Sequence, residues 1–184
     1  MNFRKTFYLA GLFLAFNLFI SCDNEPETYV NVDEASFLYT ANQEVDVPVG
    51  FRVSKMLAPH APFPDDLSVQ FRLKFEDGGR TNVRNLNDAS TMVVAEVQWD
   101  QEGSTSGWHM HPGIALVSMT EGEIEVVWEN ECIPRIYRAG DAFLDPGKIH
   151  KATSINGGAK AIATFLGIPN GQPATIWVAP RDCD

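Results

Sequence analysis

Three of the chain's four histidines occupy two short stretches whose spacing is typical of a metal site. His109 and His111 are two residues apart, so both imidazoles would point to the same face of a β-strand. His150 follows a Pro-Gly turn and opens a second strand-like run. Neutral imidazole is a ligand for divalent Zn, Cu, Fe and Ni and, less well, Mn. If the two stretches meet in space, the sequence predicts a divalent metal ion held by His109, His111 and His150.

The stretches around these histidines resemble the two motifs of the cupin superfamily. The first is GWHMHPG at residues 107–113, and the second is GDAFLDPGKIH at residues 140–150. The resemblance covers about residues 91–178. It implies a small antiparallel β-barrel whose inward histidines bind a divalent metal. Three-histidine sites occur in dioxygenase-like members of this superfamily.

The sequence departs from the cupin pattern at three points. Ala115 and Leu116 occupy the positions where a glutamate ligand usually follows the second histidine. The second motif is one residue shorter before His150, and Ser154 replaces the usual asparagine. A bound ion would therefore have three protein ligands, with open positions for water or substrate. The alternative is a barrel whose histidines only form internal hydrogen bonds.

Short alternating strands must position these histidines. Residues 68–75 place four apolar side chains on one face, and similar runs recur at 92–99, 114–119 and 123–128. No segment after the N-terminal region shows helical periodicity over ten residues. The sequence predicts an all-β fold, a single antiparallel β-barrel. The proline-rich stretch 58–66 is expected to be a loop with His60 at the surface.

The other notable side chains near the motifs have more ordinary predicted roles. Trp108 and Phe143 are expected to pack in the core. Asp145 precedes the Pro-Gly turn and is expected to be a turn residue rather than an acid-base group. Glu121 and Glu123 flank a hairpin turn and are expected to be solvated.

Residues 1–21 are predicted to be a bacterial lipoprotein signal peptide. A positively charged start precedes an apolar run at 7–20, which is shorter than the roughly 20 residues that a spanning helix needs. The run ends in Ser21-Cys22, which resembles a lipobox in which Cys22 becomes the lipidated first residue. The alternative is an ordinary cleaved signal peptide followed by an incidental cysteine.

The segment after the predicted signal is acidic and weakly patterned. We expect residues 22–43 to form a flexible acidic tether and residues 44–184 to form the cupin β-barrel domain. This organisation predicts a protein of the bacterial cell envelope, lipid-anchored to the outer membrane on its periplasmic or surface side. The lipid anchor would be the only contact with the membrane.

Two cysteines remain if Cys22 carries lipid. Cys132 precedes a predicted strand, and Cys183 is next to the C-terminal residue. Disulfides persist in oxidising compartments, and the remaining count is even. The sequence therefore predicts a Cys132–Cys183 disulfide, with two free thiols as the alternative.

The overall charge narrows the classes of partner. The formal net charge is -10, which argues against nucleic-acid binding because that function needs a basic surface. A small-molecule ligand or substrate is expected in the barrel, with anionic or enolisable compounds first, and a homodimer is left open. Two functions are predicted: a metal-dependent enzyme of the oxygenase or isomerase type, or a non-catalytic cupin that binds a small ligand.

Overall fold

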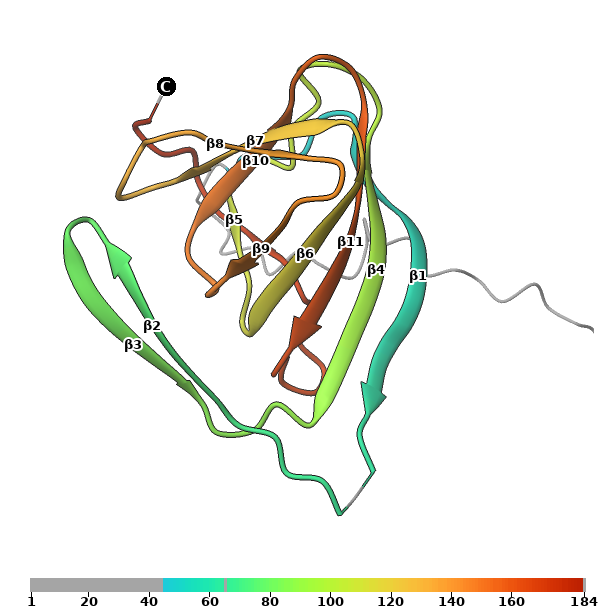
Figure 1. The fold of residues 1–184 in the computed structure, drawn as a ribbon, viewed down its shortest axis with the longest axis vertical. Helices are drawn as coiled ribbons and strands as arrows, with labels where there is room; N and C mark the ends of the chain where they lie inside the picture. The colour runs from blue at the N-terminus through green and yellow to red at the C-terminus, as the bar shows by residue number, and fades with distance from the viewer. Residues whose placement is uncertain (1–44, 65, 184) are drawn as a thin grey trace, which may run out of the picture.

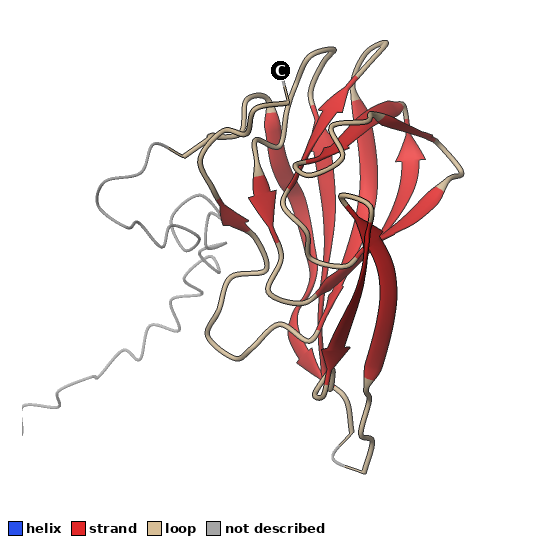
Figure 2. Ribbon diagram, turned by 90° about the vertical axis from the view of Figure 1, so that its left-hand side faces the viewer, coloured by secondary structure: helices blue, strands red, loops and turns tan. Residues whose placement is uncertain are grey.

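A computed structural model of the protein describes residues 45–64 and 66–183. The predicted signal peptide, the tether and Cys22 lie outside these residues. All regular structure in the described part consists of β-strands (Figure 2). The strands are β1 (Phe51–Pro62), β2 (Phe71–Asp77), β3 (Arg80–Leu86), β4 (Thr91–Trp99), β5 (His109–Met110), β6 (Ile114–Glu121), β7 (Glu123–Trp128), β8 (Arg135–Arg138), β9 (Ala142–Asp145), β10 (His150–Ser154), β11 (Ala159–Leu166) and β12 (Ile176–Trp177). Within these ranges, no helix is long and apolar enough to cross a membrane.

The strands form two five-stranded sheets that face each other, with the hairpin β2–β3 beside them (Figure 1). One sheet has the order β1-β4-β11-β6-β9, and the other has the order β12-β5-β10-β7-β8. Every pairing between neighbouring strands is antiparallel. The predicted all-β antiparallel barrel is therefore confirmed.

The core lies between the sheets because the central strands alternate inward and outward side chains. On β4, Val93, Ala95 and Val97 are buried, while the two residues that alternate with them are partly exposed. On β7, Ile124 and Val126 are completely buried and approach from the opposite sheet. Each such side chain contributes about 1.5–3 kcal/mol when it is removed from water. This alternation fixes the register that brings the histidines inward.

Strand β1 differs from the expectation of a loop at 58–66, because it continues to Pro62. It is an edge strand that pairs only with β4, and its pairing is interrupted by register shifts between Val53 and Ala61. Bulged edge strands tolerate prolines, since their outer N–H groups need no partner. His60 is consequently half-buried in a strand and has a positive φ of 44°, so the prediction of a surface loop histidine was wrong.

Charged side chains tie the hairpin β2–β3 to the loop that contains His111 and to the loop that precedes His150. Arg84 on β3 donates hydrogen bonds to the carbonyl oxygens of Pro112 and Pro146. Lys148 Nζ lies 2.9 Å from Asp77 Oδ1, at the end of β2. The hairpin therefore holds together two loops that are distant in sequence.

The expected disulfide is present in the structure. Cys132 and Cys183 are bonded, with their Cα atoms 5.2 Å apart. Cys183 is close to the end of the chain, so the bridge fastens the C-terminal segment to the loop that follows β7. That segment passes through β12, which pairs with β5 beside the histidines.

Candidate metal centre

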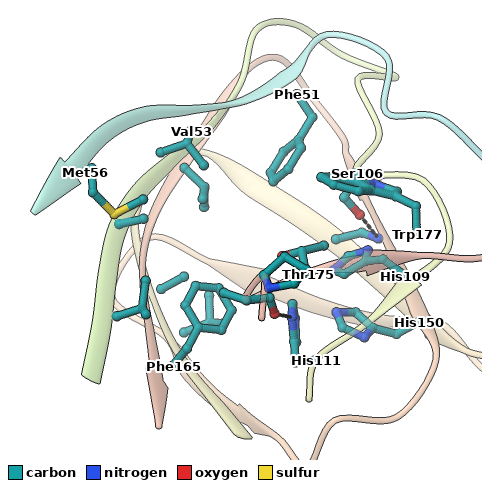
Figure 3. Close-up of a pocket in the computed structure, with 18 of the residues that line it drawn as sticks. Phe51, Val53, Met56, Ser106, His109, His111, His150, Phe165, Thr175 and Trp177 are labelled. Atoms are coloured by element: carbon teal, nitrogen blue, oxygen red, sulfur yellow. Dashed lines mark hydrogen bonds between the residues drawn. The ribbon is translucent and has the colours of Figure 1, made fainter. Parts of the chain in front are cut away.

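The three predicted histidines converge between the sheets. His109 on β5 and His150 on β10 are direct partners in the antiparallel register. Their ring centroids are 4.2 Å apart, and that of His111 lies 4.9 Å from His109 and 5.3 Å from His150 (Figure 3). Strand β5 ends at Met110, so His111 does not share a strand with His109 as predicted. It lies in the irregular link to β6, and its ring still turns toward the other two.

Backbone hydrogen bonds fix the orientation of all three rings. Each histidine donates its Nδ1–H to a main-chain carbonyl oxygen: His109 to Gly107 at 2.9 Å, His111 to Ala174 at 2.8 Å and His150 to Lys148 at 2.9 Å. This arrangement selects the tautomer in which Nε2 carries a free lone pair. The potential ligand nitrogens of the three residues all lie within 4.8 Å of one another.

Burial keeps two of the imidazoles neutral, which is the form that binds metal. Desolvation lowers the pKa of His111 to about 4 and outweighs the nearby charge of Asp145, which raises it. Desolvation, followed by the neighbouring His150 and His111, lowers the pKa of His109 well below its usual value. Three oriented, buried nitrogen donors fit a divalent transition metal. In the alternative, where the histidines only form internal hydrogen bonds, the Nε2 lone pairs would have no partner.

The two motif segments thus lie side by side between antiparallel sheets, as the cupin resemblance predicts. No protein-family model and no curated protein matches the chain. Among solved structures, the polyketide cyclase RemF from Streptomyces resistomycificus is similar, with 12% identity, a TM-score of 0.48 and coverage of 80% of this chain and 87% of that one. A cupin-like protein from Thermotoga maritima shows 18% identity, a TM-score of 0.43 and coverage of 67% and 88%.

A double-stranded β-helix protein from Klebsiella pneumoniae shows 18% identity and a TM-score of 0.42, covering 81% of this chain and 95% of that one. The barrel itself is built from two five-stranded antiparallel sheets that face each other.

An apolar cavity of about 420 Å³ opens beside the histidines of the barrel (Figure 3). Its lining includes Phe51, Met56 and Phe165, together with the three histidines. No aspartate, glutamate, lysine or arginine lines it among the described residues. His60 also lines the cavity, and its Nδ1 is buried without a hydrogen-bond partner. A ligand in this cavity would meet the histidines at one place and apolar side chains over most of its remaining surface.

The other residues singled out in the sequence lie in the core, along the cavity or at the surface. Trp108 is completely buried, as expected. Phe143 packs against the core and also lines the cavity. The Glu121 side chain is 62% exposed, which agrees with a solvated position. Glu123 is only 18% exposed and pairs with Arg138 at 2.9 Å, so the prediction that it is solvated was wrong.

Asp145 is a buried neighbour of the histidines that the sequence interpretation missed. Its Oδ1 accepts hydrogen bonds from the backbone N–H groups of Gly147 and Lys148, which confirms the predicted turn role. Its Oδ2, however, lies 3.7 Å from Nε2 of His111 and 3.5 Å from Nδ1 of His150. The residue is 0% exposed. Alternation along β9 was the only available signal, since Phe143 and Asp145 share a face.

We expect Gly147→Ala, in the loop between β9 and β10, to lower the free energy of unfolding by about 3 kcal/mol or more. Gly147 has a φ of +83°, and an added Cβ would lie 2.6 Å from the carbonyl oxygens of His111 and Gly113 and would also meet Arg84 Nη1. Both backbone strain and backbone collision therefore oppose the substitution. Urea unfolding of the variant measures the loss.

Gly79→Ala is the matched control for this substitution. Gly79 has a similar φ of +75°, but nothing lies within 4 Å of an added Cβ. It should cost about 1 kcal/mol, from backbone strain alone. If the two variants lost equal free energy of unfolding, the close approach of the His111 and Gly113 carbonyl oxygens to Gly147 would be contradicted.

The metal-free protein is expected to lose stability as the pH falls from about 6.5 toward 4. The pKa of His111 drops from its usual 6.5 in the unfolded chain to about 4 in the folded protein. The unfolded state therefore binds more protons in this window, and the contribution of His111 is lost on acidification. Linkage gives roughly 3 kcal/mol for this residue. Urea unfolding of wild type and His111→Gln at several pH values isolates the effect, and a pH-independent difference between them would contradict it.

Proposed function

We propose that the protein binds one divalent metal ion through His109, His111 and His150 and holds a small, largely apolar molecule against that ion. The observation that carries this proposal is the set of three oriented Nε2 atoms beside an apolar cavity. The metal is of the Fe, Mn, Zn, Ni or Cu type, which imidazole ligands suit. When bound, it would act as a Lewis acid toward an oxygen atom of the ligand.

The cavity lining restricts the class of ligand. A volume of about 420 Å³ is within the range of small-molecule sites. A second anionic group, away from the metal, would be buried without a charged partner in the lining. The expectation of anionic ligands therefore narrows to an apolar body that carries one metal-binding head group.

A pair of hydroxamic acids tests this ligand class, because the two share one metal-binding head. Benzohydroxamate should bind the Zn²⁺-loaded protein about 30-fold more tightly than acetohydroxamate, since burial of the ring contributes roughly 2 kcal/mol more than burial of a methyl group. Isothermal titration with and without Zn²⁺ measures both affinities. Equal affinities, or binding that does not depend on metal, would contradict the proposal.

The finer proposal is that this site catalyses a reaction of the oxygenase or isomerase type. Three protein ligands leave coordination positions open for a reacting molecule, which supports it. The alternative is a ligand-binding cupin without turnover. Incubation of the Fe- or Mn-loaded protein with a candidate ligand, followed by mass spectrometry, separates them: a new product supports the enzyme, and unchanged ligand supports the binding protein.

We also propose that the protein is exported and anchored by lipid on Cys22. The Cys132–Cys183 disulfide supports export, because such bridges persist in oxidising compartments. Cys22→Ser should release soluble protein or leave the precursor uncleaved, because the residue that accepts the lipid is removed. Membrane fractionation and intact mass measure this outcome, and unchanged membrane attachment of the variant would refute the anchor.

A further inference from the structure

Asp145, the last residue of β9, has a buried carboxyl group that is only half satisfied by hydrogen bonds. The residue is 0% exposed, so water does not solvate its carboxylate. Oδ1 accepts the N–H groups of Gly147 and Lys148 at 3.1 and 3.2 Å. Oδ2 is buried and has no hydrogen-bond partner. A buried carboxylate oxygen without a partner is unfavourable, which calls for a compensating positive charge.

The protein's own side chains compensate this oxygen incompletely. His150 Nδ1 is 3.5 Å from Oδ2, but its hydrogen is donated to the carbonyl oxygen of Lys148. His111 Nε2 is 3.7 Å away, beyond hydrogen-bond distance. Arg84 interacts electrostatically with Asp145, yet its Nη1 and Nη2 donate to the carbonyl oxygens of Pro146 and Pro112. Oδ2 therefore faces the histidine cluster without a hydrogen bond from any cationic side chain.

We propose that Asp145 supplies the negative charge of the metal centre, offsetting an ion held by the three histidines. This inference rests on the proposed metal binding. Oδ2 lies 3.7 Å from Nε2 of His111, so a divalent ion held by that nitrogen would share its water-excluded surroundings with this carboxyl oxygen. Asp145 pairs in register with Ala115 on β6, which is completely buried and brings no charge of its own. The carboxylate thus reaches the centre from β9 rather than from β6.

The Asp145→Asn variant tests the effect of the carboxylate charge while keeping the shape of the side chain nearly unchanged. The amide is nearly isosteric and retains an oxygen for the two backbone N–H groups, but it removes the charge. We expect the affinity for Zn²⁺, measured by titration against a competing chelator, to fall at least about tenfold. The melting temperature of the metal-free variant should be unchanged or higher, because an uncompensated buried charge is gone. The rise in melting temperature on adding Zn²⁺ should shrink.

Two further variants complete the test. Asp141→Asn makes the same change of charge at an exposed residue, whose Oδ2 accepts the Arg138 N–H, and should leave Zn²⁺ affinity unaltered. Asp145→Ser removes the charge with a smaller side chain, so it tests the same point if the amide does not fit.

The outcomes distinguish this inference from the proposed function. Wild-type Zn²⁺ affinity in the charge-removed variants, or a lower melting temperature of the metal-free form with an undiminished response to Zn²⁺, would overturn the role of Asp145 alone. A wild-type protein that binds no Zn²⁺, Mn²⁺ or Fe²⁺ would overturn the metal centre and this inference together.

Discussion

Replacing any one of His109, His111 and His150 by alanine is expected to weaken binding of a divalent metal by about 100-fold or more. Each residue presents one oriented Nε2, and its Nδ1 is already engaged by a backbone carbonyl oxygen. Two remaining imidazoles would leave a labile ion weakly held. The loss should exceed the roughly 10- to 100-fold effect of changing a residue that only supports a ligand. Zn²⁺ titration in competition with a chelator measures each variant.

His60→Ala is the matched control, because it removes the fourth histidine of the chain. His60 lines the same cavity but is not a member of the cluster whose ligand atoms lie within 4.8 Å. Its removal should leave metal affinity within a few-fold of wild type while altering the binding of an apolar ligand. If this variant lost as much metal as the other three, the assignment of ligands would be contradicted.

Removing the disulfide is expected to lower the free energy of unfolding by about 2–4 kcal/mol. Cys132 and Cys183 are separated by 51 residues, and closing so long a loop restricts the unfolded chain strongly. The loop contains β8 to β12, including the strand that bears His150. Urea unfolding of the Cys132→Ser/Cys183→Ser double variant, compared with the oxidised wild type, measures the change.

Reduced wild type provides the control for that comparison. Its stability should match that of the double variant, since both lack the same cross-link. Labelling of two thiols in non-reduced wild type, or a double variant as stable as the oxidised protein, would contradict the contribution of the bridge.

The parts of the structure that could be predicted are those that local sequence determines. Alternation of buried and exposed residues along β4 and β7 was visible in the sequence, because a sheet with one covered face imposes a period of two. The histidine cluster was also predictable in composition, since His109 and His111 are close in sequence and His150 follows a tight turn. Within this cluster the structure differs from the prediction only at His111, which lies just beyond the end of β5 and not on the same strand as His109.

The parts that were missed depend on contacts between distant segments. Asp145 looked like a turn residue, and its burial follows from pairing with Ala115 across β6 and β9. Ala115 and Leu116 occupy the positions where the cupin pattern has a glutamate, whereas the carboxyl group that lies near the histidines, that of Asp145, is on the neighbouring strand β9. Strand β3 was not predicted, because its sequence RTNVRNL is largely polar and partly exposed. It is positioned by pairing with β2 and by the bonds of Arg84.

The wild-type protein should hold one divalent metal ion at His109, His111 and His150 of its antiparallel β-barrel. Plasma mass spectrometry of the purified protein, after loading with metal and removal of the excess by gel filtration, tests it most directly. The account predicts one equivalent of metal in wild type and none in the variant that lacks His109, His111 and His150 together. Wild type without bound metal, or equal metal in both proteins, would contradict the account.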